Sequence, residues 1–159
     1  MTESNPILLG VQVSEIHPSP EFRLGTRVWL DGTLFEYIQA GGTALVAGEV
    51  YIIPSTKILA DKLSSSNDNG PVKLGVPQIA ITASYYGWVA IQGNLNVKVL
   101  LDCVANTKLY STATAGALDD TATSVALIPG LFTLSTAPAS PASSILAAHA
   151  AIELYTAGA

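Results

Sequence analysis

The chain is poor in both cysteine and charge. Cys103 is its one cysteine, so no disulfide can form within the chain, and its largely apolar surroundings predict a buried structural thiol rather than a nucleophile. Only 12% of the residues are charged, whereas about 25% is usual in soluble domains. After Asp120 the single charged residue is Glu153. This distribution favours a surface covered by other copies or by a larger assembly, and the alternative is a weakly charged β-protein rich in Thr, Ser and Ala.

Features of membrane, secreted and nucleic-acid-binding proteins are also missing. No run of about 18 apolar residues is present, and the opening MTESNPILLG lacks the basic and apolar regions of a secretory signal. The net charge is −5, and the basic residues are scattered along the sequence, whereas a nucleic-acid partner needs clustered Lys and Arg to neutralise its phosphates. We therefore expect no membrane and no nucleic-acid partner.

Catalytic motifs are absent as well. The sequence has no GxSxG nucleophile elbow, no HExxH zinc motif and no GxxxxGK[ST] phosphate loop. His17 has Glu15 and Glu21 nearby in an expected loop, and His149 has Glu153 four residues later. A relay from His149 and Glu153 to Ser143 or Ser144 would make a small hydrolase, but such a triad depends on spatial geometry.

Two acidic segments could suggest a metal. Asp119 and Asp120 are adjacent, and side chains of adjacent residues on an extended strand point to opposite faces, so we expect a turn or surface loop there. Asp68 lies in SSSNDNGP, which we interpret as a solvated loop because it lacks the spacing of a calcium loop. We predict no enzymatic activity and no catalytic, cofactor-binding or metal site.

Two dipeptides predict β-hairpins. Asp31-Gly32 lies between apolar alternating runs and favours a type I′ turn, which would pair Leu30 with Thr33, Val28 with Phe35 and Arg27 with Glu36. In YYGWVAIQGNLNVKVLLDC, the dipeptide Gly93-Asn94 predicts a second such turn, with Ala90 opposite Val97 and Trp88 opposite Val99. Trp88 is then most simply a core residue.

The remaining segments are less regular. STKILADKL at 55–63 could make one or two helical turns. Pro129-Gly130 interrupts the apolar segment 127–134 and suggests an edge strand or a bulge. Segment 143–156 can be a helix or a strand, and we favour a strand at 151–156. The sequence thus predicts a mainly β fold: a compact antiparallel β-sandwich or β-barrel built of hairpins, with at most one or two short helices. An extended N-terminal arm, residues 1–20, precedes a single β-rich domain, residues 21–159.

Two stretches resemble a known family. The first is EFRLGTRVWLDGTLFEYIQAGGTALVAGEVYIIP, with an AGxxALxAGxxY pattern from Ala40 to Tyr51, and the second is LGVPQIAITASYYGWVAIQGNLNVKVL followed by LYSTATAGALDDTATS. Together they resemble the decoration, or cement, proteins encoded beside major capsid genes in tailed bacteriophages. The resemblance runs from about Glu21 to Thr136 and leaves out the first twenty residues and the alanine-rich tail.

This resemblance implies a structural virion protein without cofactors or catalytic residues. Such a protein is made in the host bacterial cytoplasm, binds the outside of the phage head and bridges subunits of the major capsid protein to stabilise the shell. We expect it to be a homotrimer, with residues after about Asp120 in the interface and the N-terminal arm reaching a neighbour or the capsid. A virion-associated carbohydrate-binding or tail-associated module, using Trp88, Tyr85 and Tyr86, is the alternative function.

Overall fold

Residues 11–121, 126–136 and 144–149 are described by a computed structural model. Every regular element in this part of the chain is a β-strand. The strands are β1 (Arg27–Leu30), β2 (Thr33–Ala40), β3 (Tyr51–Ile52), β4 (Ile58–Leu59), β5 (Leu74–Pro77), β6 (Tyr86–Lys98), β7 (Lys108–Ser111), β8 (Leu118–Asp119), β9 (Leu127–Thr133) and β10 (Ser144–His149). The mainly β fold predicted from the sequence is confirmed.

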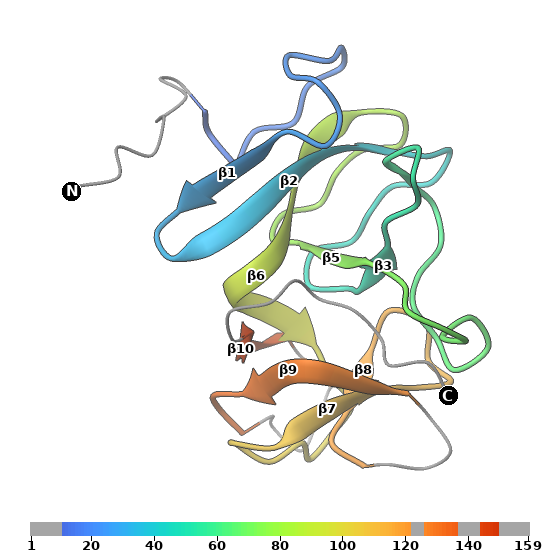
Figure 1. Cartoon of the computed structure of the whole chain (residues 1–159), viewed down its shortest axis with the longest axis vertical. Coiled ribbons are helices and arrows are strands. Elements are labelled where there is room, and N and C mark those ends of the chain that lie inside the picture. Colours follow the sequence, from blue (N-terminus) through green and yellow to red (C-terminus); the bar gives the residue numbers. More distant parts are fainter. Residues whose placement is uncertain (1–10, 122–125, 137–143, 150–159) are drawn as a thin grey trace.

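The strands form two lobes joined by the long strand β6 (Figure 1). In the first lobe β1, β2, β3, β4 and β5 gather around the first half of β6. In the second lobe β7, β8, β9 and β10 continue from its second half. The strand order is β1-β2-β6-β10-β9-β7-β8, and the described strands do not close into a barrel. The barrel alternative is therefore wrong.

The hairpin at Asp31-Gly32 is confirmed in detail. Both residues have positive φ, 49° and 77°, as a type I′ turn requires. The register pairs Leu30 with Thr33, Val28 with Phe35 and Arg27 with Glu36. Local turn chemistry and cross-strand pairing were therefore sufficient to place β1 against β2.

The hairpin predicted at Gly93-Asn94 is wrong, because β6 runs straight through this dipeptide. The first half of β6 pairs with β2, up to Leu34 opposite Gln92, and the second half pairs with β10, beginning at Gly93. Gly93 has φ of 95°, so the glycine does supply the unusual backbone that a turn signal indicates. Here that backbone lets β6 change partners as it passes the β1–β2 turn, where Thr33 Oγ1 donates a 2.7 Å hydrogen bond to the carbonyl of Asn94.

Two other segments differ from the helical interpretations. Segment 55–63 contains no helix: Ile58 and Leu59 form β4, which runs parallel to β2. Leu59 and Leu63 are both buried. Their four-residue spacing therefore arises from an irregular segment that buries both side chains, and not from one face of a helix. At the C-terminal end, residues 144–149 form β10 between β6 and β9. The strand favoured at 151–156 lies outside the described residues.

The bulge alternative at Pro129-Gly130 is confirmed. Strand β9 contains both residues and pairs with β7 on one side and β10 on the other, so it is not an edge strand. Its register against β7 shifts between Lys108 and Tyr110, and Gly130 has φ of 76°. Proline has no N–H and cannot donate a hydrogen bond to the neighbouring strand. The bulge places Pro129 where the ladder does not need such a donor.

One apolar core extends through both lobes. It contains Phe35, Tyr37 and Trp88 from the first lobe and Leu109 and Leu131 from the second. A second cluster lies on the other face of β2 and β6, with Ile38, Ile81 and Ile91 among its members. Because β2 and the first half of β6 are covered on both faces, their burial is almost continuous and does not alternate.

The part of the expected N-terminal arm that is described, residues 11–20, lies against the domain. Val11 and Val13 pack against the core shared by the lobes, and Ile16 against the second cluster. The backbone of His17 forms a two-way bridge with Tyr86, with N···O distances of 2.9 and 2.8 Å. Residues 1–10 of the arm lie outside the described residues.

Candidate interaction surfaces and buried charges

Glu36 is a fully buried carboxylate surrounded by cations. It extends from β2, and Arg27 Nε lies 2.8 Å and Lys73 Nζ 2.5 Å from its Oε2, while Lys57 Nζ lies 3.1 Å from Oε1. Burial by itself would raise the pKa of Glu36, but the hydrogen bonds and charges of Lys73 and Lys57 outweigh it and leave the pKa below 4.5. The carboxylate is therefore ionised and ties β1, β2, the loop before β4 and the start of β5 together.

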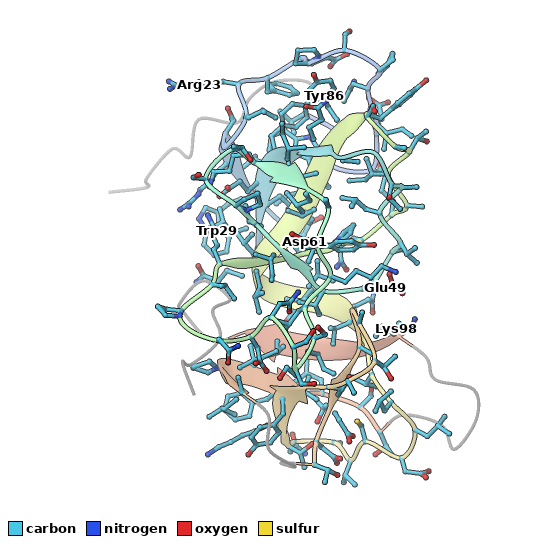
Figure 2. The ribbon with its side chains drawn as sticks, turned by 90° about the vertical axis from the view of Figure 1, so that its right-hand side faces the viewer. Arg23, Trp29, Glu49, Asp61, Tyr86 and Lys98 are labelled. Atoms are coloured by element: carbon cyan, nitrogen blue, oxygen red, sulfur yellow. The ribbon has the colours of Figure 1, made fainter. Side chains whose placement is uncertain are left out.

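Glu49 is the centre of a second cluster, which joins the lobes. Lys62 Nζ lies 2.7 Å from its Oε2, and Lys98 Nζ, from the end of β6, lies 2.8 Å from its Oε1. Figure 2 shows Glu49 and Lys98 side by side. Burial opposes ionisation, but the two lysines lower the pKa of Glu49. The hydroxyl of Tyr51 also donates to Glu49 Oε2, at 3.2 Å, and burial chiefly raises the pKa of Tyr51 to about 12.

The two clusters use most of the positive charge in the chain. The sequence has seven basic residues, and five of them bind Glu36 or Glu49. These five come from positions 27 to 98, which is why they look scattered in the sequence. Arg27 stays 44% exposed and the four lysines 12% to 33% exposed, so the clusters anchor these cations to buried carboxylates without removing them from the surface.

The segment 64–71 is a loop, as expected, and most of it reaches solvent, but Asp68 within it is buried. The hydroxyl of Ser111 donates to Asp68 Oδ2, and the backbone N–H of Ala126 donates to the same oxygen at 3.2 Å. Asp68 is only 4% exposed. Its carboxylate accepts hydrogen bonds from β7 and from the start of β9. The sequence contained no signal for these hydrogen bonds, because the donors are 43 and 58 residues away.

Cys103 is buried, as predicted, and lies beside the acid pair. Ligand atoms of Cys103, Asp119 and Asp120 all lie within 4.8 Å of one another. Asp119 is the last residue of β8 and Asp120 follows it in a bend, so the expected turn or surface loop holds for Asp120 alone. The thiol donates to Asp119 Oδ1 at 3.4 Å, and the N–H of Val104 donates to Asp120 Oδ2 at 2.8 Å. Burial chiefly raises the pKa of Cys103 to about 12. The two hydrogen bonds hold the loop that begins at Cys103 against Asp119 and Asp120.

Of the two histidines, only His17 has a described side chain. His17 is buried, and its Nδ1 lies 2.9 Å from Oε1 of the exposed Glu21. His149 is in β10, and nothing is described of its side chain or of Ser144's. Glu153 and Ser143 lie outside the described residues. The prediction of no catalytic, cofactor or metal residue stays a prediction.

The aromatic residues are mainly structural. Trp88 is 1% exposed, and its ring centroid lies 4.9 Å from that of Tyr37 and 5.3 Å from that of Phe22. The core placement of Trp88 is thus confirmed, and a buried ring cannot stack on a sugar. Tyr85 and Tyr86 are half-buried. The exposed aromatics in the described part of the chain are instead Trp29, 44% exposed on β1, and Phe132, 37% exposed on β9. Sequence reasoning treated Trp29 only as part of a hairpin.

Large apolar side chains are exposed in both lobes. In the first lobe Trp29 and Leu30 lie on β1, and Figure 2 shows Trp29 projecting on the same side of the molecule as Arg23. In the second lobe the exposed side chains are Leu101, Val104, Phe132 and Leu134. Thr133 Oγ1 donates to the carbonyl of Val104 at 2.6 Å, which holds the 104 loop against the end of β9.

Comparison with known proteins adds no relative. No family model matches the chain, and no curated protein matches it. The resemblance to capsid cement proteins therefore stays a prediction. No described helix is long and apolar enough to span a bilayer.

Proposed function

We propose that this protein is a capsid decoration protein, which binds the outside of a phage head and bridges subunits of the major capsid protein. The observation that carries the proposal is the presence of exposed apolar side chains in both lobes, while two buried glutamates hold five of the seven basic residues in ion pairs. A decoration protein that also self-associates needs one surface for the shell and another for sister copies, and Trp29 and Leu30 lie exposed in one lobe while Phe132 and Leu134 lie exposed in the other. Aromatic residues are enriched at the centres of protein interfaces, and charged residues are depleted there.

The internal ion pairs suit this role mechanically. A cement protein resists separation of the subunits it joins, so force passes through its own fold. Lys98 binds Glu49 across the lobes, and the N–H of Lys98 donates to the carbonyl of Gly48 at 2.7 Å. These contacts supplement the shared apolar core and oppose any hinge movement at β6. The protein would act through many modest contacts and carry out no reaction.

The decisive experiment is binding to capsid shells. The protein is mixed with shells of the major capsid protein encoded in the same genome, and its cosedimentation is measured against concentration. We expect saturable binding and shells that dissociate at a higher temperature. A matched chain lacking residues 1–10 tests the arm: we expect it to fold normally and bind more weakly. Absence of cosedimentation by the full chain would contradict the proposal.

A further inference from the structure

The loop of residues 100–107, which connects β6 to β7, holds two large apolar side chains in solvent. Leu101 and Val104 are 45% and 54% exposed, whereas Cys103 between them is buried. Asp102 has φ of 63°, a backbone conformation that aspartate adopts more readily than most residues. The chain therefore turns at this point, so that one side chain lies inside the second lobe and its apolar neighbours lie outside.

The backbone of this loop is fixed at both ends and in its middle. The N–H of Leu100 donates to the carbonyl of Leu118, and the N–H of Asn106 donates to the carbonyl of Thr133, each at 2.8 Å. Between these two points the carbonyl of Val104 accepts the hydroxyl of Thr133 at 2.6 Å. A partner that binds here would have little of the loop left to order, and such preorganisation increases affinity.

Carboxylates lie beside the two apolar side chains. Asp102 is exposed between them. Asp120 Oδ2 accepts the N–H of Val104 at 2.8 Å, and Asp119 Oδ1 accepts the thiol of Cys103 at 3.4 Å. None of the ion pairs found among the described residues includes any of these three aspartates. The loop is thus an apolar protrusion with a negative rim.

The distribution of positive charge indicates what kind of protein fits this protrusion. Five of the seven basic residues direct their charge at Glu36 or Glu49. The other two are far apart, because Arg23 precedes β1 in the first lobe and Lys108 begins β7 in the second. A sister copy therefore has no cluster of unengaged cations to place against the rim, and two such loops facing each other would repel. The complementary surface belongs to a different protein.

We propose that loop 100–107 is a contact with the shell, in which Leu101 and Val104 enter an apolar pocket of a major capsid protein subunit. Lysine or arginine residues at the border of that pocket would face Asp102, Asp119 and Asp120. This inference rests on the proposed function, which supplies the partner, and adds the surface and its chemistry. The apolar centre of such a contact supplies most of the affinity, whereas the charged rim speeds association and makes it salt-dependent.

The apolar centre is tested by cosedimentation with shells of the major capsid protein encoded in the same genome. Leu101→Ser with Val104→Ser should bind the shells at least about tenfold more weakly than wild type. Thermal unfolding should be unchanged because both side chains already reach solvent, and so should the sedimenting mass of the protein alone. Val46→Ser, at a position 47% exposed in the first lobe, is the control and should bind as wild type does.

The charged rim is tested by Asp102→Asn. Asparagine tolerates the positive φ of this position, so the loop should keep its conformation. Loss of one exposed charge should weaken shell binding about threefold at low salt, and the difference should disappear at about 0.5 M salt. Asp61→Asn, at an exposed position in the first lobe, is the matched control and should bind as wild type does.

The outcomes separate this inference from the function on which it rests. If wild type binds the shells and either loop variant binds equally well, the loop contact is refuted and the proposed function stands. A smaller sedimenting mass for Leu101→Ser with Val104→Ser would also overturn the inference, because a sister copy would then cover the loop. If wild type does not bind the shells, the proposed function is refuted and the inference falls with it.

Discussion

Gly93 lies directly against Gly32: a Cβ on Gly93 would be 2.2 Å from the carbonyl oxygen of Gly32. The two glycines place the middle of β6 against the β1–β2 turn. Gly93→Ala should destabilise the protein by roughly 2–4 kcal/mol, because φ of 95° strains an alanine and the clash is with backbone. The free energy of unfolding in urea measures this.

Gly32→Ala is the matched control. Gly32 also has positive φ, 77°, but no heavy atom lies within 4 Å of the position its Cβ would occupy. We expect a cost of about 1 kcal/mol from backbone strain alone. Equal costs for the two substitutions would contradict the close contact, and would fit a free turn at Gly93-Asn94 instead.

Glu36→Gln should be one of the more damaging single changes. It leaves Arg27, Lys57 and Lys73 without the carboxylate that they share. Breaking a fully buried pair costs about 3–5 kcal/mol, but Arg27 and Lys57 reach solvent, so we expect about 2–3 kcal/mol by urea unfolding. Lys108→Gln, at an exposed position, is the control and should stay within about 0.5 kcal/mol of wild type.

The folded protein should lose stability in acid because Glu36 and Glu49 become protonated. The pKa values of Glu36 and Glu49 are both lowered from 4.5 in the folded protein. When folding lowers the pKa of a carboxyl group, the ionised group stabilises the folded protein at pH values above its unfolded pKa. This contribution to stability disappears as the pH falls through the folded pKa. We therefore expect the melting temperature to drop as the pH is lowered below about 4.5. The double variant Glu36→Gln with Glu49→Gln should show a shallower drop, and an identical slope would refute the assignment.

Cys103 should be inert in the native protein. Its thiol is buried and its pKa is raised to about 12, so the reactive thiolate is scarce at neutral pH. A thiol reagent at pH 8 should label the folded chain only as fast as it unfolds, and should label it at once in denaturant. Rapid labelling of the native protein would mean that Cys103 is an exposed, activated thiol.

How far the sequence predicts this fold depends on how far apart the partners are. The hairpin at Asp31-Gly32 was predictable down to the Arg27–Glu36 pair, because turn and partners lie within ten residues. The Gly93-Asn94 signal was as strong locally, yet β6 continues because its second half pairs with β10, about fifty residues later. Nothing in the flanking residues reports such a partner.

The same limit applies to the candidate site. Low charge and missing motifs predicted a protein of contacts, but not where the contacts lie. Lys73 and Glu36 are 37 residues apart, and Lys98 and Glu49 are 49 apart, so the ionic clusters could not be found from spacing. Exposure of Trp29 likewise follows from β1 being the end of the strand order, which is a property of the whole topology.

The last prediction concerns the second lobe. We expect a homo-oligomer in which residues after about Asp120 form much of the interface, and Phe132 and Leu134 are exposed there at 37% and 43%. The number of three copies follows from the resemblance and from the threefold positions of a capsid, and not from a residue pattern. A stable interface needs about 2,000 Å² or more with an apolar centre. Phe132→Ser with Leu134→Ser should therefore reduce the sedimenting mass from trimer to monomer.

Folding of this double variant should be preserved, because both side chains already reach solvent. Val46→Ser, at a position 47% exposed in the first lobe, controls for the loss of surface apolar area and should leave the trimer intact. If the wild-type chain sediments as a monomer at every concentration, the second lobe is not a self-interface. A wild-type trimer that survives Phe132→Ser with Leu134→Ser would place the interface elsewhere.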